Sequence, residues 1–573
     1  MKFVLTLMSC FLITCCFAQQ TIFEKSNGTA TATYFETLNF YKGLDKTADN
    51  ILVKEMGETD ASYPLHLVLV SSDKKFNPTQ WHAQNKVVIL INNAIHAGEP
   101  DGVDASMILV RDIKDKKIIL PSNVVLAIIP IYNIGGALNR NTNSRVSQNG
   151  PIAYGFRGNA QNLDLNRDFT KNDSRESKSF AQLFHWLKPT IFIDNHVSDG
   201  ADFQHTITLI TTQYEKLGNV NGIWLRNTFE PAIYNGMKEK KWDLIPYVEF
   251  ETANFDKGID MFYETPRYSS GYAALFGCFS FITETHMLKP YKERVTATYD
   301  LMQTFISQSS LLANEIINTK IKAAEEVKLQ QTFPLKWVID KTKKSEIIFK
   351  GYAQDTTISE ATGLPRMYYN HLKPYTKNVS FYNYYKPDIV VEKPLAYIIP
   401  AGWKDVIERL RLNSVALQKI KQDTTIFVSL YKIESYKSRT ISYEKHHPNG
   451  QVKISEKMDS IKFLAGGWLI NMNQPNNRYI IEMLEPTGDD GFFVWNFFDA
   501  ILQQKEGYSD YRWEELAAAY LKTNIILQQQ LEEKKKSDTA FAKNANAQLD
   551  FIYKNSPYYE KSHNRYPIYK IVK

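Results

Sequence analysis

The sequence predicts an α/β protein, with a mixed, mostly parallel sheet covered by helices on both faces, followed by a β-rich C-terminal domain with helical insertions. Apolar runs alternate with helix-spaced segments up to about residue 330, the pattern of strands buried on both faces. Beyond that point, shorter runs are separated by Pro, Gly, Asp and Asn turns, which favours β structure. A chain of 573 residues also exceeds the length of one typical domain.

The expected elements of the α/β domain follow from the period of the apolar residues. Short apolar runs predict strands at 65–71, 87–92, 124–133, 190–196 and 279–286. Helical spacing predicts helices at 34–55, 103–113, 177–187 and about 295–329, the last of which closes the domain.

The C-terminal part has a different texture. Its expected strands include SEIIFKGY, NVSFYNYY, TTIFVSLYKI and GGWLINM, and its expected helices are WKDVIERLRL, VWNFFDAILQQK and WEELAAAYLKTNIILQQQLEEKKK. The Glu/Lys-rich end of the last helix is most simply a solvated face. We therefore expect three parts: a leader at 1–18, an α/β domain at 19–330 and an accessory domain at 331–573.

Residues 1–18 have the layout of a secretory signal peptide. Lys2 precedes an apolar core that runs to about Phe17, and the small residue Ala18 follows it. We therefore expect a secreted or periplasmic protein. Lipoprotein processing at Cys10 is the less favoured alternative, because the apolar stretch before it is very short.

Charge and cysteine content narrow the class of partner and site. A net charge of +6 is small for this length and indicates neither a nucleic-acid groove nor a polybasic membrane patch. No later segment is long and apolar enough to predict a transmembrane helix. Three of the four cysteines precede residue 19 and only Cys278 follows it, so we expect no internal disulfide, and any metal site must use His, Asp and Glu.

Four polar clusters lie where predicted strands end, the edge at which α/β sheets bind ligands. They are His96-x-x-Glu99, the loop NLDLNRDF at 162–169, His196 and Glu284. Two histidines and a glutamate form the open, three-ligand set typical of catalytic zinc. Taken alone, the first cluster also fits a surface turn before a helix, and a lone His196 fits a structural role, so the argument depends on their coincidence.

In order and spacing, these clusters resemble the zinc carboxypeptidase family over roughly residues 25–325. The resemblance implies the zinc carboxypeptidase fold and one Zn²⁺ per chain, held by His96, Glu99 and His196. The C-terminal part, with FFVWNFFDAILQQKEGYSDY, resembles the accessory region of large secreted bacterial members.

The resemblance also assigns roles around the metal. Asp164 would accept the second ring N–H of a ligand histidine. Asn166 and Arg167 would bind the terminal carboxylate of the substrate, for which a planar guanidinium is suited. Glu284 would be the general base that takes a proton from water and passes it to the leaving amine.

A further arginine and a tyrosine complete the implied site. Arg157, seven residues before Asp164, is expected to stabilise the oxyanion, with Arg145 as the alternative and otherwise a substrate contact. The family's mobile tyrosine has three candidates in the segment DMFYETPRYSSGYAAL, of which Tyr272 is chosen over Tyr263 and Tyr268. Asp194, on the strand face of His196, is a further candidate to hold that ring.

Gly98 departs from the family pattern, because digestive carboxypeptidases carry an arginine before the ligand glutamate. Part of that subsite is therefore missing or rebuilt here.

These observations favour a secreted zinc metallocarboxypeptidase that acts on the C-terminus of a peptide or protein; they predict no oligomeric state. The first alternative is a zinc amidase or deacylase of the same fold, acting on cell-wall peptides or N-acyl amino acids. The second is a binding protein that has lost catalysis, against which the intact ligand set and Glu284 argue.

Overall fold

The computed structural model describes residues 19–248 and 255–572, in two compact units. The first unit runs to Val391 and includes Leu412–Ser414 and Pro475–Tyr479. The second comprises Glu392–Arg411, Val415–Gln474 and Ile480–Lys573. The expected signal peptide at 1–18 lies outside the described residues. The expected boundary between the α/β domain and the accessory domain, at residue 331, stays a prediction.

The described part of the first unit is built around an eight-stranded sheet of order β1-β2-β4-β3-β5-β9-β6-β7. The central strands β4, β3, β5 and β9 run parallel, while β1, β2 and β6 add antiparallel pairings. The predicted mixed, mostly parallel sheet is therefore confirmed. Its strands are β1 Ile51–Glu55, β2 His66–Ser71, β3 Val87–Asn93, β4 Val124–Ile129, β5 Ile191–Ser198, β6 Ile207–Thr211, β7 Ile245–Pro246 and β9 Phe279–His286.

Helices cover both faces of this sheet. Val87, Ile89 and Ile91 of β3 pack in one apolar cluster with residues of α4 and α10. The alternate residues Val88 and Leu90 pack in a second cluster with residues of α6, as the two-residue period of a strand requires. The helices of this unit are α1 Ile22–Lys25, α2 Tyr34–Thr47, α3 Pro78–Ala83, α4 Asp101–Lys114, α5 Ile134–Leu138, α6 Arg175–Leu187, α7 Gly218–Trp224, α8 Glu230–Glu239, α9 Ser269–Ala274, α10 Tyr291–Leu311 and α11 Ala313–Leu329.

Three predicted elements of this unit have different bounds. The helix expected at 34–55 ends at Thr47. Residues 51–55 form β1, because the apolar run ILV, which contains the β-branched residues Ile51 and Val53, pairs with β2. The strand expected at 124–133 ends at Ile129, since Pro130 has no N–H to continue the ladder. The helix expected at 295–329 is two helices, separated at Leu312, where φ is −100° and ψ is 13°.

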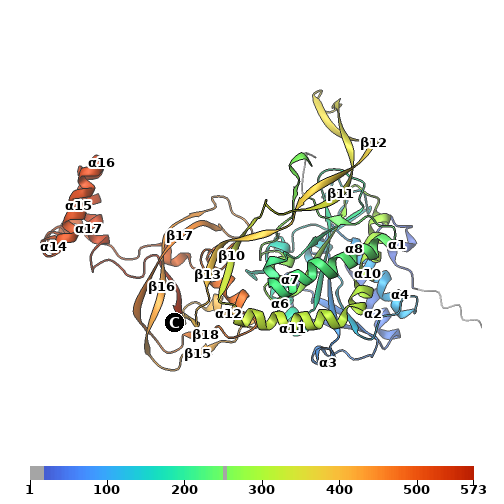
Figure 1. Ribbon diagram of the computed structural model, residues 1–573, viewed down its shortest axis with the longest axis horizontal. Coiled ribbons are helices and arrows are strands. Elements are labelled where there is room, and N and C mark those ends of the chain that lie inside the picture. The colour runs from blue at the N-terminus through green and yellow to red at the C-terminus, as the bar shows by residue number, and fades with distance from the viewer. Residues whose placement is uncertain (1–18, 249–254, 573) are drawn as a thin grey trace, which may run out of the picture. The chain divides into compact units, whose positions relative to one another are not determined.

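The first β-rich stretch after residue 331 belongs to the first unit. Strands β11 (Ser345–Ile358) and β12 (Pro365–Tyr382) form a long antiparallel ribbon that extends beyond the main sheet, as Figure 1 shows. At its base, β12 pairs in parallel with β8 (Ile259–Asp260). A two-stranded sheet joins β10 (Thr332–Ile339) to β13 (Tyr385–Glu392).

The second unit contains a six-stranded sheet of order β15-β18-β14-β19-β16-β17 in its described part, which confirms its predicted β-rich character. The segment VWNFFDAILQQK is not the expected helix. It forms only the 3₁₀ turn η5 (Asp499–Leu502), because Asn496 has a φ of 65°, outside the helical region. The strands are β14 Ala396–Ile399, β15 Gln418–Lys419, β16 Thr424–Ser438, β17 Asn449–Phe463, β18 Trp468–Asn471 and β19 Arg565–Ile571.

The remaining helices are α12 Lys404–Leu412, α13 Asn477–Leu484, α14 Asp510–Thr523, α15 Ile525–Ser537, α16 Thr539–Ala542 and α17 Ala545–Lys554. The long helix predicted from Trp513 onward is interrupted at Asn524, whose side chain caps α15. Across the described ranges, no helix combines the length and apolar character needed to cross a membrane.

Candidate metal centre and active site

The end of β3 turns sharply to bring His96 and Glu99 together. Ala94, directly after the strand, has a left-handed φ of 55°, and the Glu99 N–H donates to the His96 carbonyl oxygen at 2.9 Å. In this turn, His96 Nδ1 lies 3.1 Å from Glu99 Oε1. Pro100 follows directly and is the N-cap of α4. The turn therefore ends at Glu99.

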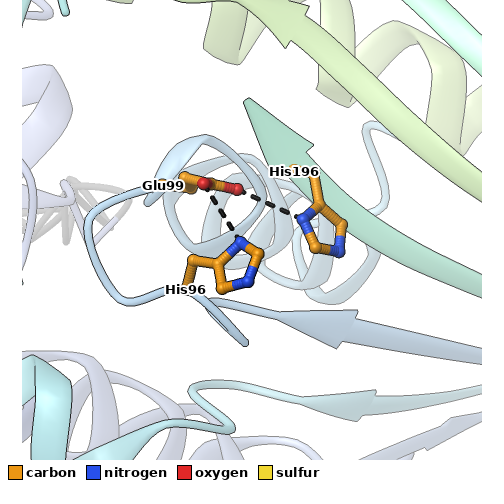
Figure 2. Close-up of side chains that lie close together, drawn as sticks. All are labelled: His96, Glu99 and His196. Atoms are coloured by element: carbon orange, nitrogen blue, oxygen red, sulfur yellow. Dashed lines mark hydrogen bonds and ion pairs between the residues drawn. The ribbon is translucent and has the colours of Figure 1, made fainter. Parts of the chain in front are cut away.

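His196 reaches the same point from the carboxyl end of β5. Its Nδ1 lies 3.2 Å from Glu99 Oε2, so the carboxylate bridges the two imidazoles, as Figure 2 shows. All three side chains are buried, and they offer ligand atoms that lie within 4.8 Å of one another. The predicted His–Glu–His set therefore converges on one position.

Two further carboxylates hold the rings from behind. Asp164 Oδ1 lies 3.1 Å from His96 Nε2, and Asp194 Oδ2 lies 3.1 Å from His196 Nε2. A proton on each Nε2 leaves each Nδ1 free to bind a cation. Two imidazoles and one carboxylate, with the imidazoles oriented in this way, fit a zinc site with an open position.

The electrostatics of the centre also suit a cation. Burial alone would raise the pKa of Glu99, but His96 and Arg145 outweigh it and hold that pKa well below its usual range. Burial is likewise outweighed at Asp164, where His96 and Arg157 hold the pKa well below its usual range. Both carboxylates are therefore charged wherever the protein is folded at neutral pH.

Glu284 lies beside His196 because β5 and β9 are parallel neighbours in which these two residues are paired. Among the described residues, Glu284 Oε2 is buried without a hydrogen-bond partner, and no lysine or arginine pairs with the group. Burial raises the pKa of Glu284 to about 8. The residue as a whole is half-buried, because it lines a pocket. A carboxyl group with a raised pKa in this position is suited to accept and return a proton.

These groups open on a pocket of about 530 Å³. Of the residues predicted for the site, Asp164 and Tyr272 do not line it. The lining residues used below are His96, Glu99, Arg145, Arg157, Asn166, Arg167, His196, Tyr247, Phe262, Glu264, Tyr268 and Glu284.

The two candidate arginines have different surroundings. Arg157 is 45% exposed, and its Nε donates to Asp164 Oδ2 at 2.9 Å. Arg145 is more buried, and its Nη1 donates to Glu99 Oε1 at 2.9 Å. Arg145 therefore donates directly to the candidate ligand Glu99. Arg157 is more exposed, and its Nη1 lies 3.8 Å from the same Glu99 oxygen.

Gly98 makes room for Arg145. A Cβ at position 98 would lie 2.5 Å from Arg145 Cδ and 3.0 Å from the Gly155 carbonyl oxygen. The Nε of Arg145 also donates to Gln148, whose amide in turn donates to the Gly98 carbonyl at 3.0 Å. The space beside Gly98 is thus occupied by an arginine from another part of the chain; whether a substrate subsite is missing or rebuilt here stays a prediction.

Asn166 and Arg167 lie together at one side of the pocket, in the 3₁₀ turn η1 (Leu165–Arg167). The Ser269 N–H donates to Asn166 Oδ1 at 3.2 Å, which fixes the amide. The guanidinium of Arg167 lies over the ring of Tyr268, 4.4 Å from its centroid. The adjacent amide and guanidinium can bind one carboxylate.

The choice of Tyr272 as a substrate contact is wrong. It is fully buried, packs against Phe169 and Phe184, and donates its hydroxyl proton to Asn413 Oδ1 at 2.6 Å. The cause is the short helix α9, which turns this side chain into the core. Tyr268 lines the pocket instead.

Sequence reasoning missed several residues of the pocket wall, among them Tyr247, Phe262 and Glu264. They lie between α8 and α9, where Tyr247 follows the short strand β7 and the other two follow the short strand β8; no motif marks these positions. The acidic character of Glu264 beside an aromatic run was the one available signal.

Residues 38–199 match the model of the family described as zinc carboxypeptidase. This segment contains the three candidate metal ligands, and it also contains Asp164, Asn166 and Arg167. Glu284 lies beyond it. The match covers the turn after β3 and the end of β5, which together form the metal centre.

Two fungal carboxypeptidases are similar to this chain in sequence. "Carboxypeptidase 2" of Trichophyton rubrum is 22% identical over 503 residues, covering 82% of this chain and 84% of the relative. "Probable carboxypeptidase 2" of Arthroderma benhamiae is 22% identical over 494 residues, covering 81% and 86%. The expected bacterial type is therefore not supported.

A solved metallo-carboxypeptidase from Burkholderia cenocepacia aligns with 49% of this chain and 70% of its own, at 15% identity and a TM-score of 0.36. The family match, and the two histidines and glutamate that converge within it, identify the chain as an enzyme, a hydrolase similar to the zinc carboxypeptidases.

Proposed function

We propose that this protein is a secreted, zinc-dependent carboxypeptidase that removes C-terminal residues from peptides. The observation that carries the proposal is one pocket that contains both the His–Glu–His set and the unpaired Glu284. A binding protein without catalysis would have no use for a buried, unpaired carboxyl group beside a metal centre.

One Zn²⁺ per chain would be held by His96, Glu99 and His196, with Asp164 and Asp194 orienting the two rings. When bound there, zinc supplies a Lewis acid that polarises a carbonyl group and acidifies water.

Asn166 and Arg167 bind the terminal carboxylate of the substrate in this proposal. Their positions, side by side in η1, let the amide and the guanidinium bind the two carboxylate oxygens. This contact places the last peptide bond near Glu284 and excludes bonds in the middle of a chain. Arg145, whose guanidinium is committed to Glu99, lines the same pocket and is a secondary substrate contact.

Arg157 stabilises the negative charge that develops on the carbonyl oxygen during attack. Its exposed guanidinium and its anchor on Asp164 suit a donor held in place before the reaction. Glu284 accepts the proton of the attacking water and returns it to the nitrogen of the leaving amino acid. Its pKa, raised to about 8 by burial, favours a group that can perform both transfers.

Secretion is proposed from residues 1–18 alone. Their Lys2, apolar core and Ala18 are typical of a cleaved signal peptide.

The test is to incubate the purified, zinc-loaded protein with a mixed peptide library and to follow the masses. Stepwise loss of C-terminal residues, abolished by a chelator and by Glu284→Gln, supports the proposal. Release of acyl groups or of cell-wall fragments, with peptides left intact, would contradict it and favour an amidase or deacylase. Glu485→Gln is the matched control, because Glu485 is also a buried glutamate with a raised pKa but belongs to the second unit.

A further inference from the structure

The first unit contains two short segments from late in the chain, Leu412–Ser414 and Pro475–Tyr479. The first segment carries Asn413, whose side chain is fully buried. The Asn476 side chain donates to the carbonyl oxygens of Asn413 at 3.2 Å and of Ser414 at 2.9 Å, so the two segments hold each other. A buried amide is costly unless it is hydrogen-bonded, and the partners of Asn413 therefore indicate its role.

The oxygen of the Asn413 amide holds the short helix α9. It accepts the hydroxyl proton of Tyr272 at 2.6 Å, and it lies 3.3 Å from His185 Nε2 of α6. The Tyr272 N–H in turn donates to the Tyr268 carbonyl oxygen at 2.9 Å. The contact with Asn413 therefore also restrains the residue directly before α9.

The nitrogen of the same amide holds the loop that follows η1. Asn413 Nδ2 donates to Asn172 Oδ1 at 3.2 Å. Asn172 donates its side-chain N–H to the Phe169 carbonyl oxygen at 3.2 Å and its backbone N–H to the Asp168 carbonyl oxygen at 3.0 Å. Because Asp168 directly follows Arg167, this series of contacts leads to the proposed carboxylate-binding residues.

Asn413 thus joins the two elements that form the carboxylate-binding side of the pocket. Asn166 and Arg167 come from η1. At the start of α9, the Ser269 N–H donates to Asn166 Oδ1, and the Tyr268 ring lies against the Arg167 guanidinium. The two elements lie far apart in the chain and each is only a short helix, so their relative position depends on tertiary contacts.

Ring packing connects the second segment to the same helix. Phe276, which follows α9, packs against Tyr272 with ring centroids 5.1 Å apart. Its other neighbour, the fully buried Tyr479, stacks on it with centroids 5.1 Å apart and ring planes 28° apart. Both segments from late in the chain therefore support α9.

We propose that Asn413 is a positioning residue for the carboxypeptidase reaction, which fixes η1 and α9 so that Asn166 and Arg167 bind the terminal carboxylate of the substrate. The inference rests on the proposed function, and it assigns part of the carboxylate-binding side to a segment beyond the zinc carboxypeptidase match. Loss of the amide takes a hydrogen-bond partner from both the Tyr272 hydroxyl and Asn172 Oδ1. Binding groups that lose such support bind less tightly, because they are no longer held in the binding geometry.

The test uses zinc-loaded full-length enzyme and two N-blocked peptides that differ only in ending with a free carboxylate or with an amide. In Asn413→Ala, KM for the free carboxylate is expected to rise about tenfold while kcat changes by less than about threefold, because the carboxylate contact is made in both the bound substrate and the transition state. The ratio of kcat/KM for the free carboxylate to that for the amide should fall by about the same factor. Zinc affinity, measured by competition with a chromophoric chelator, should change by less than about threefold, since the metal ligands keep their own partners.

Tyr272→Phe tests the contact with α9 by a smaller change. It removes the hydroxyl group and keeps the ring packing, and KM for the free carboxylate is expected to rise about threefold. Tyr566→Phe is the matched control. Tyr566 is also fully buried and donates its hydroxyl proton, to the Leu484 carbonyl oxygen at 2.7 Å, but it belongs to the second unit. This control should leave KM unchanged.

Unchanged KM and unchanged preference for the free carboxylate in Asn413→Ala and Tyr272→Phe would overturn the positioning role and leave carboxypeptidase function intact. A rise in KM of the same size in Tyr566→Phe, or a loss of kcat without a change in KM, would also overturn it. Should Asn413→Ala fail to fold, as judged by circular dichroism, Tyr272→Phe decides alone. If the unaltered enzyme cleaves neither peptide, or cleaves both at equal rates, the proposed function itself fails, and the positioning role with it.

Discussion

Each of the two units contains a cluster of ionisable side chains that are mostly buried, and the clusters differ in what surrounds them. The metal cluster of the first unit consists of His96, Glu99, Asp164, Asp194 and His196. The lysine cluster of the second unit consists of Tyr397, Tyr431, Glu456, Glu485 and Lys570. Among the described residues, each unit has one buried carboxylate oxygen without a hydrogen-bond partner at its cluster. In the first unit it belongs to Glu284, which lies beside the metal cluster, and in the second it belongs to Glu485, a member of the lysine cluster.

The two clusters differ in whether a ligand can reach them and in whether their carboxylates have a cationic partner. Lys570 lies 2.9 Å from Glu456 Oε1, and the Tyr397 hydroxyl donates to Glu485 Oε1 at 2.7 Å, so the lysine cluster supplies its own counter-charge. In the first unit, two imidazoles and a carboxylate converge and open on the 530 Å³ pocket beside Glu284. Buried, perturbed groups therefore indicate a functional site only where they converge on a space that a ligand can enter.

The largest expected difference between the two units is in kcat, when Glu284 or Glu485 is replaced by glutamine. Glu284→Gln is expected to lower kcat roughly 10²- to 10⁴-fold, because proton transfer loses its base. Zinc content, measured by metal analysis, should stay at one per chain. Glu485→Gln should retain kcat, and a comparable loss of kcat in both variants would contradict the distinction.

The second largest effect is expected on zinc affinity, when a carboxylate that holds a candidate ligand histidine is replaced. Asp194→Asn weakens the hold on His196 Nε2 and is expected to reduce zinc affinity about 10- to 100-fold. Competition with a chromophoric chelator measures this change without reference to activity. Unchanged zinc affinity would show that Asp194 does not orient the ring.

The lysine cluster should affect stability alone. Lys570→Met removes the cation that offsets Glu456 and Glu485, and is expected to lower the free energy of unfolding by about 2 kcal/mol. Denaturant unfolding monitored by circular dichroism measures the loss. The kcat/KM of the folded protein should not change, and a large decrease would indicate a catalytic role for the second unit.

The pH dependence of activity should report Glu284. Only the deprotonated carboxylate can act as a base, so kcat/KM is expected to fall about tenfold per pH unit below its pKa. Burial raises that pKa to about 8 from an ordinary value of 4.5, and a bound cation lowers it again. The acid limb should therefore lie between these values, and it should be absent from the residual activity of Glu284→Gln.

The smallest effect is expected at Gly98. In Gly98→Ala, the new Cβ lies 2.5 Å from the flexible Arg145 side chain and 3.0 Å from the Gly155 carbonyl, so Arg145 must shift away from Glu99. Zinc affinity should fall by only a few-fold, since the three ligands stay in place. Gly98→Arg, the residue of the digestive enzymes, should be more damaging, and normal zinc affinity in that variant would contradict the close packing.

Much of the metal centre could be predicted because its residues end regular strands. The apolar runs before His96, His196 and Glu284 locate β3, β5 and β9, and their parallel order brings the three ends together. Asp164 is predicted as a ring partner from the family resemblance, and Asp194 is a candidate because it shares a strand face with His196.

The substrate side of the pocket could not be predicted equally well. Tyr272 is one of three candidate tyrosines that the sequence could not separate. The six residues of α9 decide the direction of its side chain, and no capping signal marks that helix. Glu264 lies in an irregular stretch whose path depends on contacts with Ser270 and with the ends of distant strands. Such segments have no period for a sequence pattern to reveal.

The most direct test of the account compares a peptide with a free C-terminal carboxylate and the same peptide with a C-terminal amide. If the pocket is a carboxypeptidase site in which Asn166 and Arg167 bind the terminal carboxylate, the peptide with the free carboxylate should lose its last residue. The amide should react at least about 100-fold more slowly, because the charged hydrogen bonds to the carboxylate are lost. Equal rates for the two peptides, or cleavage at internal bonds, would contradict the central claim.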